Sequence, residues 1–569
     1  MRRRVLTLLS IVVAAIVGVA TSVFTDQRGW QWGTALVVLV LLLPAVHIWS
    51  SSSNVAMDRH AREIAKLEKA AAIYRRLAKN NSAALPDLAK VLINLSGLFY
   101  QAGRHAEGLP VAEEATAICR RLMIVDPDDY QLYLAGALTN LSNLLDELDR
   151  YAEGLAAIEE AIAIYRRLAE DNPNEYLPHL ARASNNRSNL SRKVGRRAEC
   201  LAAHEEGVTF YRRLAEDDPD IYLPDLAGAL NNLSLQLGVL GRYSEGLAAI
   251  EEAVAIRRRL AEEDPEIHQP ELAKSLHNLS NMLRGSGRRA EGLAALEEAT
   301  TIYRRLAEDT PDDHLPILAV SLFDMANLLR EVGRYAEGLA AIEEATTLYR
   351  RLAEDNPDTH LPTLAGALNN LSNLLGDVGR YAEGLTAIEE ATTLYRRLAE
   401  DNADTHLPDL ARALNNMAVR LGDVGRRVEA VAVIEEAIAI YRRLGEDHAD
   451  THLPGLARAL HNLSVQLGEL GRDAQALAAI EKATTIFRRL AEDHADTHLP
   501  DLARALGNLA LRLDKVGRHA RSLGAAGEAT RIYRRLAEDN PDAYRPELTR
   551  AANNLKYLQR RQVRRRSQK

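Results

Sequence analysis

The sequence predicts an all-α protein: a right-handed α-solenoid of antiparallel helix pairs with a 46-residue period, preceded by two N-terminal transmembrane helices. Two observations favour this class. A Gly-Arg dipeptide, or a close equivalent, returns at a constant step of 46 residues, as at Gly333, Gly379 and Gly425. Two long uncharged apolar runs precede the first of these dipeptides. Strict self-similarity at a fixed period is typical of solenoids, in which each repeat packs on its neighbours.

The N-terminal region, residues 1–55, is predicted to form a membrane hairpin with spans at about 5–24 and 32–49. Crossing ~30 Å of hydrocarbon takes roughly 20 apolar residues, and both runs come close to this length. The three tryptophans of the chain, Trp30, Trp32 and Trp49, lie at the ends of the second run, where indole rings favour the membrane interface. We therefore expect this hairpin to contact membrane lipid.

Basic residues predict the orientation of the hairpin. Arg2, Arg3 and Arg4 precede the first run, and Arg59 and Arg62 follow the second. Because basic flanks stay on the cytoplasmic side, we expect a multi-pass protein of the cell (inner) membrane with its repeat domain in the cytoplasm. The alternative is a signal peptide cleaved at the small residues 18–20, which would leave the second run as the anchor.

Residues 361–406 illustrate the expected repeat unit. Pro362 is placed in the first turn of a helix, where its missing N–H would be unpaired in any case. Leucines at helical spacing then form one buried stripe, and Gly379 ends the helix as a left-handed cap. A second helix is expected to run to about Asp401, with residues 402–406 as a loop to the next unit. Neither helix can bury its stripe alone, so stacked pairs must stabilise one another.

The same pattern organises the rest of the chain. Residues 56–84 are expected to form an N-terminal capping helix and linker, residues 85–544 ten 46-residue repeats, and residues 545–569 a C-terminal capping helix with a basic tail. The formal net charge of −8 argues against specific nucleic-acid binding, which usually requires a basic surface. The cysteines, Cys119 and Cys200, predict no disulfide framework, and we expect both in the helix core.

The segment Leu368–Leu385, L-N-N-L-S-N-L-L-G-D-V-G-R-Y-A-E-G-L, resembles the tetratricopeptide repeat in its leucine framework, its Gly-Arg-Tyr turn and its small residue Gly384. The unit is longer than usual and is most similar to the long repeats of kinesin light chains and of bacterial multi-repeat proteins. This resemblance implies a protein-binding scaffold and not an enzyme, with no cofactor. Near-identical repeats can also self-associate, so a homo-oligomeric structural assembly at the membrane is the alternative function.

An asparagine recurs in the first helix of nearly every unit, although asparagine is a poor former of helix interiors. In superhelical members of the family such asparagines hold the backbone of an extended peptide, so the resemblance implies a concave groove for a cytoplasmic protein or peptide. An amide both donates and accepts, and can therefore pair with peptide groups whatever the side chain. The alternative is a hydrogen bond between repeats that fixes their stacking. The candidate residues are Asn94, Asn140, Asn186, Asn232, Asn278, Asn370, Asn416, Asn462 and Asn508.

Two further columns vary between repeats and, by the same resemblance, line the concave face. The second column is mostly amide in the early repeats and apolar from Val419 onwards, which predicts a groove whose C-terminal half accepts apolar side chains. The same residues can also be read as packing variation. The candidate specificity residues are His277, Phe323 and His461 in the first column, and Val419, Val465 and Leu511 in the second.

Arg-Arg pairs recur in the second helices, usually with acidic residues four positions later, as in Arg396 with Glu400. This spacing predicts a solvated ridge of ion pairs within each helix, with a surface for an acidic partner as the alternative. Histidines such as His360 and His406 also recur, but equivalent positions in successive helix pairs are too far apart to share a metal ion. We expect these histidines to pack in loops and predict no metal site.

Overall fold

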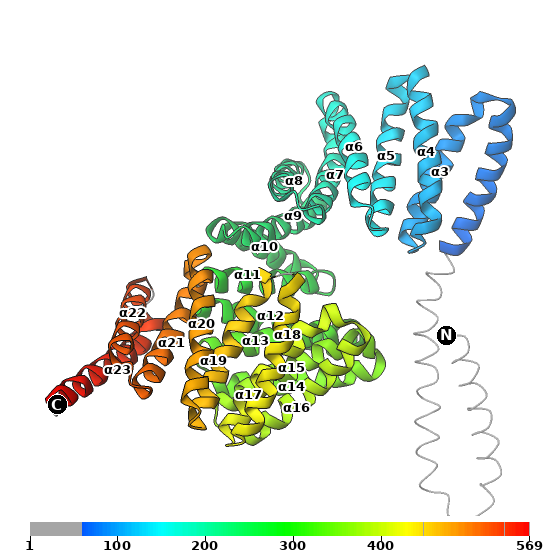
Figure 1. Ribbon diagram of the computed structural model, residues 1–569. Helices are drawn as coiled ribbons and strands as arrows, with labels where there is room; N and C mark the ends of the chain where they lie inside the picture. The colour runs from blue at the N-terminus through cyan, green and yellow to red at the C-terminus, as the bar shows by residue number, and fades with distance from the viewer. Residues whose placement is uncertain (1–59, 448, 540, 568–569) are drawn as a thin grey trace, which may run out of the picture. The chain divides into compact units, whose positions relative to one another are not determined.

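The computed structural model describes residues 60–447, 449–539 and 541–567, and every regular element within these ranges is helical (Figure 1). The predicted all-α class and the repeated helix pairs are therefore confirmed. The predicted membrane hairpin, residues 1–55, lies outside the described residues. Within the ranges that the structure describes, no helix is both long and apolar enough to cross a membrane.

In the described part of the chain, a helix over residues 60–80 and a 3-10 turn, η1 (Ser82–Ala84), precede ten helix pairs. The first helices of the pairs are α3 (Leu85–Gln101), α5 (Pro127–Glu147), α7 (Pro173–Lys193), α9 (Pro219–Val239), α11 (Pro265–Gly285), α13 (Pro311–Glu331), α15 (Pro357–Asp377), α17 (Ala403–Asp423), α19 (Ala449–Glu469) and α21 (Ala495–Lys515). The second helices are α4 (His105–Val125), α6 (Tyr151–Asp171), α8 (Arg197–Asp217), α10 (Tyr243–Glu263), α12 (Arg289–Asp309), α14 (Tyr335–Asp355), α16 (Tyr381–Asp401), α18 (Arg427–Asp447), α20 (Asp473–Asp493) and α22 (His519–Asp539). Helix α23 (Pro541–Ser567) follows the last pair.

The chain divides into two compact units, residues 1–236 and 237–569. In the second unit one continuous apolar core runs from Val254 on α10 to Leu558 on α23. In the first unit, described from residue 60, buried Ile64 of the opening helix packs with Leu95 and Phe99 of α3. Within each unit a helix packs mainly on the next helix along the chain, as expected when stability comes from neighbour contacts.

The turn inside each pair is the left-handed cap that the sequence predicts. Gly379 has φ +81°, and the Arg380 N–H donates to the Leu375 carbonyl at 2.8 Å. A backbone φ in this region favours glycine, because glycine has no Cβ atom to clash. In the one pair without this glycine, Asp149 takes the same conformation with φ +59°, which short polar side chains tolerate better than most others.

The arginine that follows the cap explains why Gly-Arg recurs as a dipeptide. The Arg380 guanidinium donates to Glu383 at 2.5 Å within α16 and lies 3.5 Å from Glu343 of the preceding α14. The hydrogen bond from Arg380 lowers the pKa of the Glu383 carboxyl. Equivalent contacts occur at Arg334 and Arg426, so the turn arginine joins neighbouring pairs.

The predicted start of the first helices was wrong by several residues. Helix α15 begins at Pro357, so Pro362 lies inside the helix and removes one N–H from its hydrogen-bond ladder. A single residue connects one pair to the next: Asn402 separates α16 from α17, and its side chain accepts from the Thr405 N–H at 3.2 Å. In several other pairs the equivalent residue is Asn or Asp followed by proline, as at Asn356 and Pro357. This combination of an N-cap residue and a proline was the stronger signal for the start of the helix.

The recurring histidines also differ from the prediction, because they lie in helices and not in loops. His360 and His406 are half-buried in the first turns of α15 and α17, where their backbone N–H groups donate to the preceding cap carbonyls at 3.2 Å. These histidines therefore lie at the junction between pairs.

Candidate functional site

The asparagine column lies on one face of the first helices, in places that are neither fully buried nor fully open. Asn94 of α3 is exposed, whereas Asn140, Asn186, Asn232, Asn278, Asn370, Asn416, Asn462 and Asn508 are half-buried. Each occupies the same position of its pair. The fold therefore brings the candidate residues into a row within each of the two units, one residue per pair.

Several amide nitrogens of this row donate to the preceding pair. Asn186 Nδ2 donates to Asn143 Oδ1 at 2.7 Å, and Asn370 Nδ2 donates to Asn327 Oδ1 at 3.0 Å. Asn140 Nδ2 donates instead to the Ile93 carbonyl at 2.9 Å. These contacts are the hydrogen bonds between repeats that formed the alternative interpretation of the column. Because these bonds do not involve a bound peptide, peptide binding by this column stays a prediction.

The two specificity columns supply the acceptors for these bonds. Where the second column is apolar, the acceptor comes from the first: Asn462 Nδ2 donates to Asn415 Oδ1 at 3.1 Å, since Val419 has no acceptor. Asn416 Nδ2 also donates to the first column, to Asn369 Oδ1 at 3.0 Å, although the second column of that pair holds Asn373. Variation in these columns is thus coupled to the stacking of the next pair, and Phe323 is half-buried against the apolar core.

One repeat has aspartate instead of asparagine in this column, and a histidine of the preceding first helix lies against it. Asp324 of α13 takes the asparagine position, and its Oδ2 lies 2.9 Å from Nε2 of His277 on α11. A carboxylate is the better partner for an imidazole that can be protonated. His277 is therefore placed against the next pair by a hydrogen bond and is half-buried.

His461 has no such partner in the next pair. The equivalent position is Asn508, whose Nδ2 is buried and makes no hydrogen bond to the described residues. Burial, with a smaller effect of Arg504, lowers the pKa of His461 to about 4. The imidazole is thus neutral at physiological pH.

The apolar specificity residues accompany a change that the sequence reasoning missed. Directly after Val419 and Val465 lie Arg420 and Gln466, at a position where α5, α7, α13 and α15 have a buried leucine, and Arg512 likewise follows Leu511. Arg512 is only 6% exposed. Each of these side chains occupies space that a side chain would need at a glycine 44 residues earlier, as with Arg512 and Gly468. The sequence signal for these large side chains was the glycine that precedes each of them by 44 residues, at Gly376, Gly422 and Gly468.

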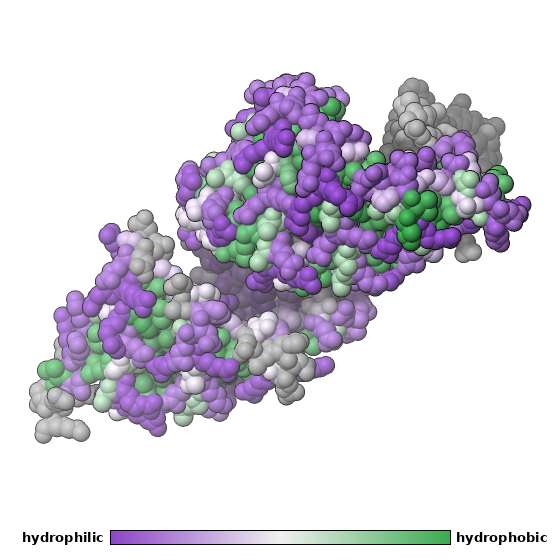
Figure 2. All heavy atoms as spheres, turned by 90° about the horizontal axis from the view of Figure 1, so that it is seen from above, coloured by the Kyte–Doolittle hydropathy of each residue, from purple (hydrophilic) through white to green (hydrophobic). Residues whose placement is uncertain are grey.

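Most ion pairs of the Arg-Arg ridge join neighbouring pairs, although Arg259 and Glu263 of α10 lie 3.7 Å apart at the predicted spacing. Arg396 donates to Glu436 of the next second helix at 2.9 Å, and not to Glu400 as the spacing predicted. The same contact, 39 or 40 residues apart, recurs at Arg75, Arg120, Arg166, Arg258, Arg304, Arg350 and Arg488. Hydrophilic residues cover much of the face shown in Figure 2. The exposed ridge is therefore an inter-repeat ladder.

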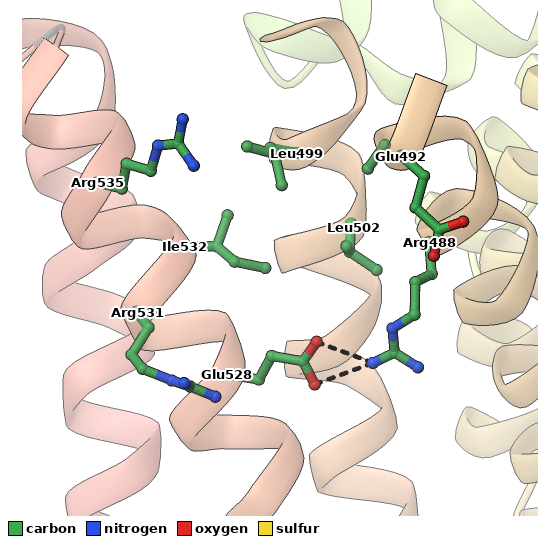
Figure 3. Close-up of a pocket in the computed structure, with 9 residues that line it drawn as sticks. Arg488, Glu492, Leu499, Leu502, Glu528, Arg531, Ile532 and Arg535 are labelled. Carbon is green, nitrogen blue, oxygen red and sulfur yellow. Dashed lines mark hydrogen bonds and ion pairs between the residues drawn. The ribbon is translucent and has the colours of Figure 1, made fainter. Parts of the chain in front are cut away.

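A depression of about 430 Å³ lies among α20, α21 and α22, away from every predicted site residue (Figure 3). Leu499 and Ile532 form part of its apolar wall, and Arg531 and Arg535 extend from α22 beside them. The Arg488–Glu528 pair of the ladder crosses one side at 2.8 Å. Among the described residues, no group of histidine, cysteine and acidic side chains is arranged to hold a metal ion.

Five segments match the sequence profile of the family described as Tetratricopeptide repeat: residues 134–175, 226–266, 272–315, 364–404 and 410–450. The chain therefore contains tetratricopeptide repeats, a fold that typically serves protein interaction rather than catalysis. Residues 304–365 and 446–506 also match the profile of Anaphase-promoting complex subunit 5. No curated protein matches the sequence.

Several solved structures are similar in fold. BtubC (BKLC) from P. vanneervenii is 21% identical, with a TM-score of 0.36 over 44% of this chain and 92% of that chain. A Podosopora anserina protein of kinesin-light-chain type, with nearly identical TPR-like repeats, is 18% identical, with a TM-score of 0.33 over 39% and 98%. A Rap protein complexed with competence and sporulation factor is 13% identical, with a TM-score of 0.37 over 71% and 99%.

Proposed function

We propose that this protein is a membrane-anchored interaction scaffold whose asparagine-lined face binds an extended segment of a cytoplasmic protein or peptide. The observation that carries the proposal is the row of half-buried amides, several of which are held by the preceding pair. Asn416 and Asn462 each use one N–H in this way. An asparagine amide also has a second N–H and a carbonyl oxygen, and with these we propose that it pairs with the backbone of a bound chain.

The inter-repeat bonds favour binding, because they hold the amides in one orientation before a partner arrives. A preorganised site loses less side-chain entropy on association. The apolar residues Val419, Val465 and Leu511 adjoin this row, and Leu511 is 38% exposed. We propose that they accept apolar side chains of the bound segment.

Membrane anchoring is part of the proposal and rests on the sequence. The uncharged runs at residues 5–24 and 32–49, with tryptophans at the ends of the second, are those of a transmembrane hairpin. Anchoring would place the repeats at the cytoplasmic face of the cell membrane and hold a captured partner there.

The test uses the full-length chain in nanodiscs as bait for a cytoplasmic extract. Wild type is compared with the double variant Asn416→Ala/Asn462→Ala and with a matched control, Arg350→Ala/Arg396→Ala. The control also removes two inter-repeat contacts, but on the outer ladder. We expect a partner held by wild type and by the control to be lost from the asparagine variant at unchanged helicity. Equal retention by all three forms would contradict the asparagine site, and capture of this chain alone would favour self-assembly.

A further inference from the structure

The third pair, α7 and α8, has a core unlike that of any other pair. At five positions the remaining nine pairs carry only apolar residues, and this pair carries a polar one or glycine. Ser184 replaces a leucine that is present in all the others, and Gly207 replaces an alanine that is present in all the others. The full set is Ser184, Arg187, Ser191, His204 and Gly207.

These substitutions lie in the centre of the packing and not at its edge. Ser184 and Ser191 are 0% exposed, and His204 is 6% exposed. The equivalent residues of the seventh pair, Leu368 and Ile388, are 1% and 0% exposed. The same buried volume is thus filled with smaller or polar groups, which lowers the apolar area that this pair removes from water.

The polar groups are only partly satisfied. Arg187 donates to Glu206 at 2.6 Å, and Ser184 Oγ lies 3.5 Å from the same carboxylate. Arg187 Nε and Ser191 Oγ are buried and make no hydrogen bond to described residues. A buried donor or acceptor without a partner opposes folding, because water would satisfy it in the open state.

Gly207 also lowers the stability of this pair, and no close contact requires a glycine at this position. A Cβ at Gly207 would lie 3.9 Å from the Ala181 carbonyl oxygen and 4.0 Å from the Ser184 Cβ, which is ordinary contact. Alanine would therefore fit. A glycine inside a helix favours the unfolded chain, since it gains more backbone freedom there than alanine.

We propose that the α7–α8 pair is a weak link in the array, which opens locally under native conditions while pairs on either side stay folded. In a repeat array stability is close to a sum of each repeat and its neighbour contacts, so a weak repeat lowers stability where it lies. Opening there would interrupt the neighbour contacts and uncouple the helices before α7 from those after α8.

The two cysteines provide a matched pair of probes. Cys200 of α8 and Cys119 of α4 are both 0% exposed, so each thiol must await an opening before it can react. The measurement is the rate of alkylation of each cysteine in the full-length chain in nanodiscs. Each rate is divided by the rate in denaturant, which removes the difference in intrinsic thiol reactivity. We expect the normalised rate of Cys200 to exceed that of Cys119 by about tenfold or more, as for a local rather than global opening.

Variants that give α7 and α8 the apolar residues found at the same positions of the other pairs test whether these five residues cause the local weakness. Ser184→Leu/Arg187→Leu/Ser191→Leu/His204→Ile should slow the labelling of Cys200 and leave Cys119 unchanged. Gly207→Ala, which needs no repacking, should slow Cys200 by roughly threefold. The control is Gly136→Ala in α5, where a Cβ meets nothing within 4 Å. Equal normalised rates for the two thiols, or a Cys200 rate that Gly207→Ala and Gly136→Ala change alike, would overturn the proposal.

Discussion

The Arg420 guanidinium occupies the space in which a side chain at Gly376 would lie, one helix pair earlier. The arginine is largely buried, with 13% of its side chain exposed. One pair further back the equivalent positions hold the opposite combination, Arg330 and Leu374. A long side chain on one pair is thus matched by a small or short one on its neighbour.

This match predicts strong coupling between the two positions. Gly376→Arg alone should destabilise the array, because its side chain meets Arg420, and Arg420→Leu alone should leave unfilled space. The double variant recreates the Arg330–Leu374 combination and should recover most of the loss. A double-mutant cycle from urea unfolding should give a coupling of about 1 kcal/mol or more, and an additive result would contradict the match.

The outer ladder is broken by one substitution, and restoring it should stabilise the protein. Lys482 holds the position where every other repeat from Glu114 to Glu528 has glutamate, opposite the position of Arg442. Lys482→Glu should raise the free energy of unfolding by about 0.2–1 kcal/mol, as for an exposed ion pair. The gain should shrink in 1 M salt. Lys482→Gln is the control, and an equal gain from it would show that only a repulsion was removed.

A carboxylate at residue 508 should raise the pKa of His461 from its value of about 4. Asn508→Asp copies the Asp324 partner of His277, and an adjacent negative charge favours the protonated imidazole. NMR titration of ¹³C-labelled histidine measures this pKa directly. A His461 that titrates as in wild type would show that the two side chains do not meet in solution.

Stability should fall in mild acid because of His204. Burial, with a smaller effect of Arg192, lowers the pKa of His204 from 6.5 to about 4. Because the folded pKa lies below the unfolded one, the unfolded chain takes up the proton first and stability decreases as the pH falls from 6.5 towards 4. The loss should approach about 3 kcal/mol. The urea-unfolding profile of His204→Ile should lack this component, and identical profiles would contradict it.

The repeat period, the helix pairs and the left-handed cap could all be predicted from sequence, because each depends on local spacing or on one residue type. The start of α15 could not be placed from Pro362, since two prolines competed and the helix begins at the earlier one, Pro357. The same error in the helix start made the predicted connection between pairs, residues 402–406, longer than the single residue Asn402 that the structure has.

Contacts between pairs were harder to predict than contacts within a helix. Arg396 has an acidic residue four positions later, yet it bonds Glu436, because stacking brings the two second helices within reach. The asparagine column was recognised as polar and recurrent, but its acceptors alternate between two neighbouring columns, as at Asn327 and Asn369. Periodicity alone does not say which of the two columns supplies the acceptor.

The single-residue connection at Asn402 has a consequence for how such an array can change in length. With one residue between α16 and α17 and a fixed turn within each pair, there is no slack to absorb a partial insertion. A tandem duplication or a deletion of one whole period, in contrast, rejoins surfaces of the same kind, because each pair meets the next through equivalent contacts. Genetic recombination between repeats can therefore alter the number of helix pairs in single steps without disturbing the core.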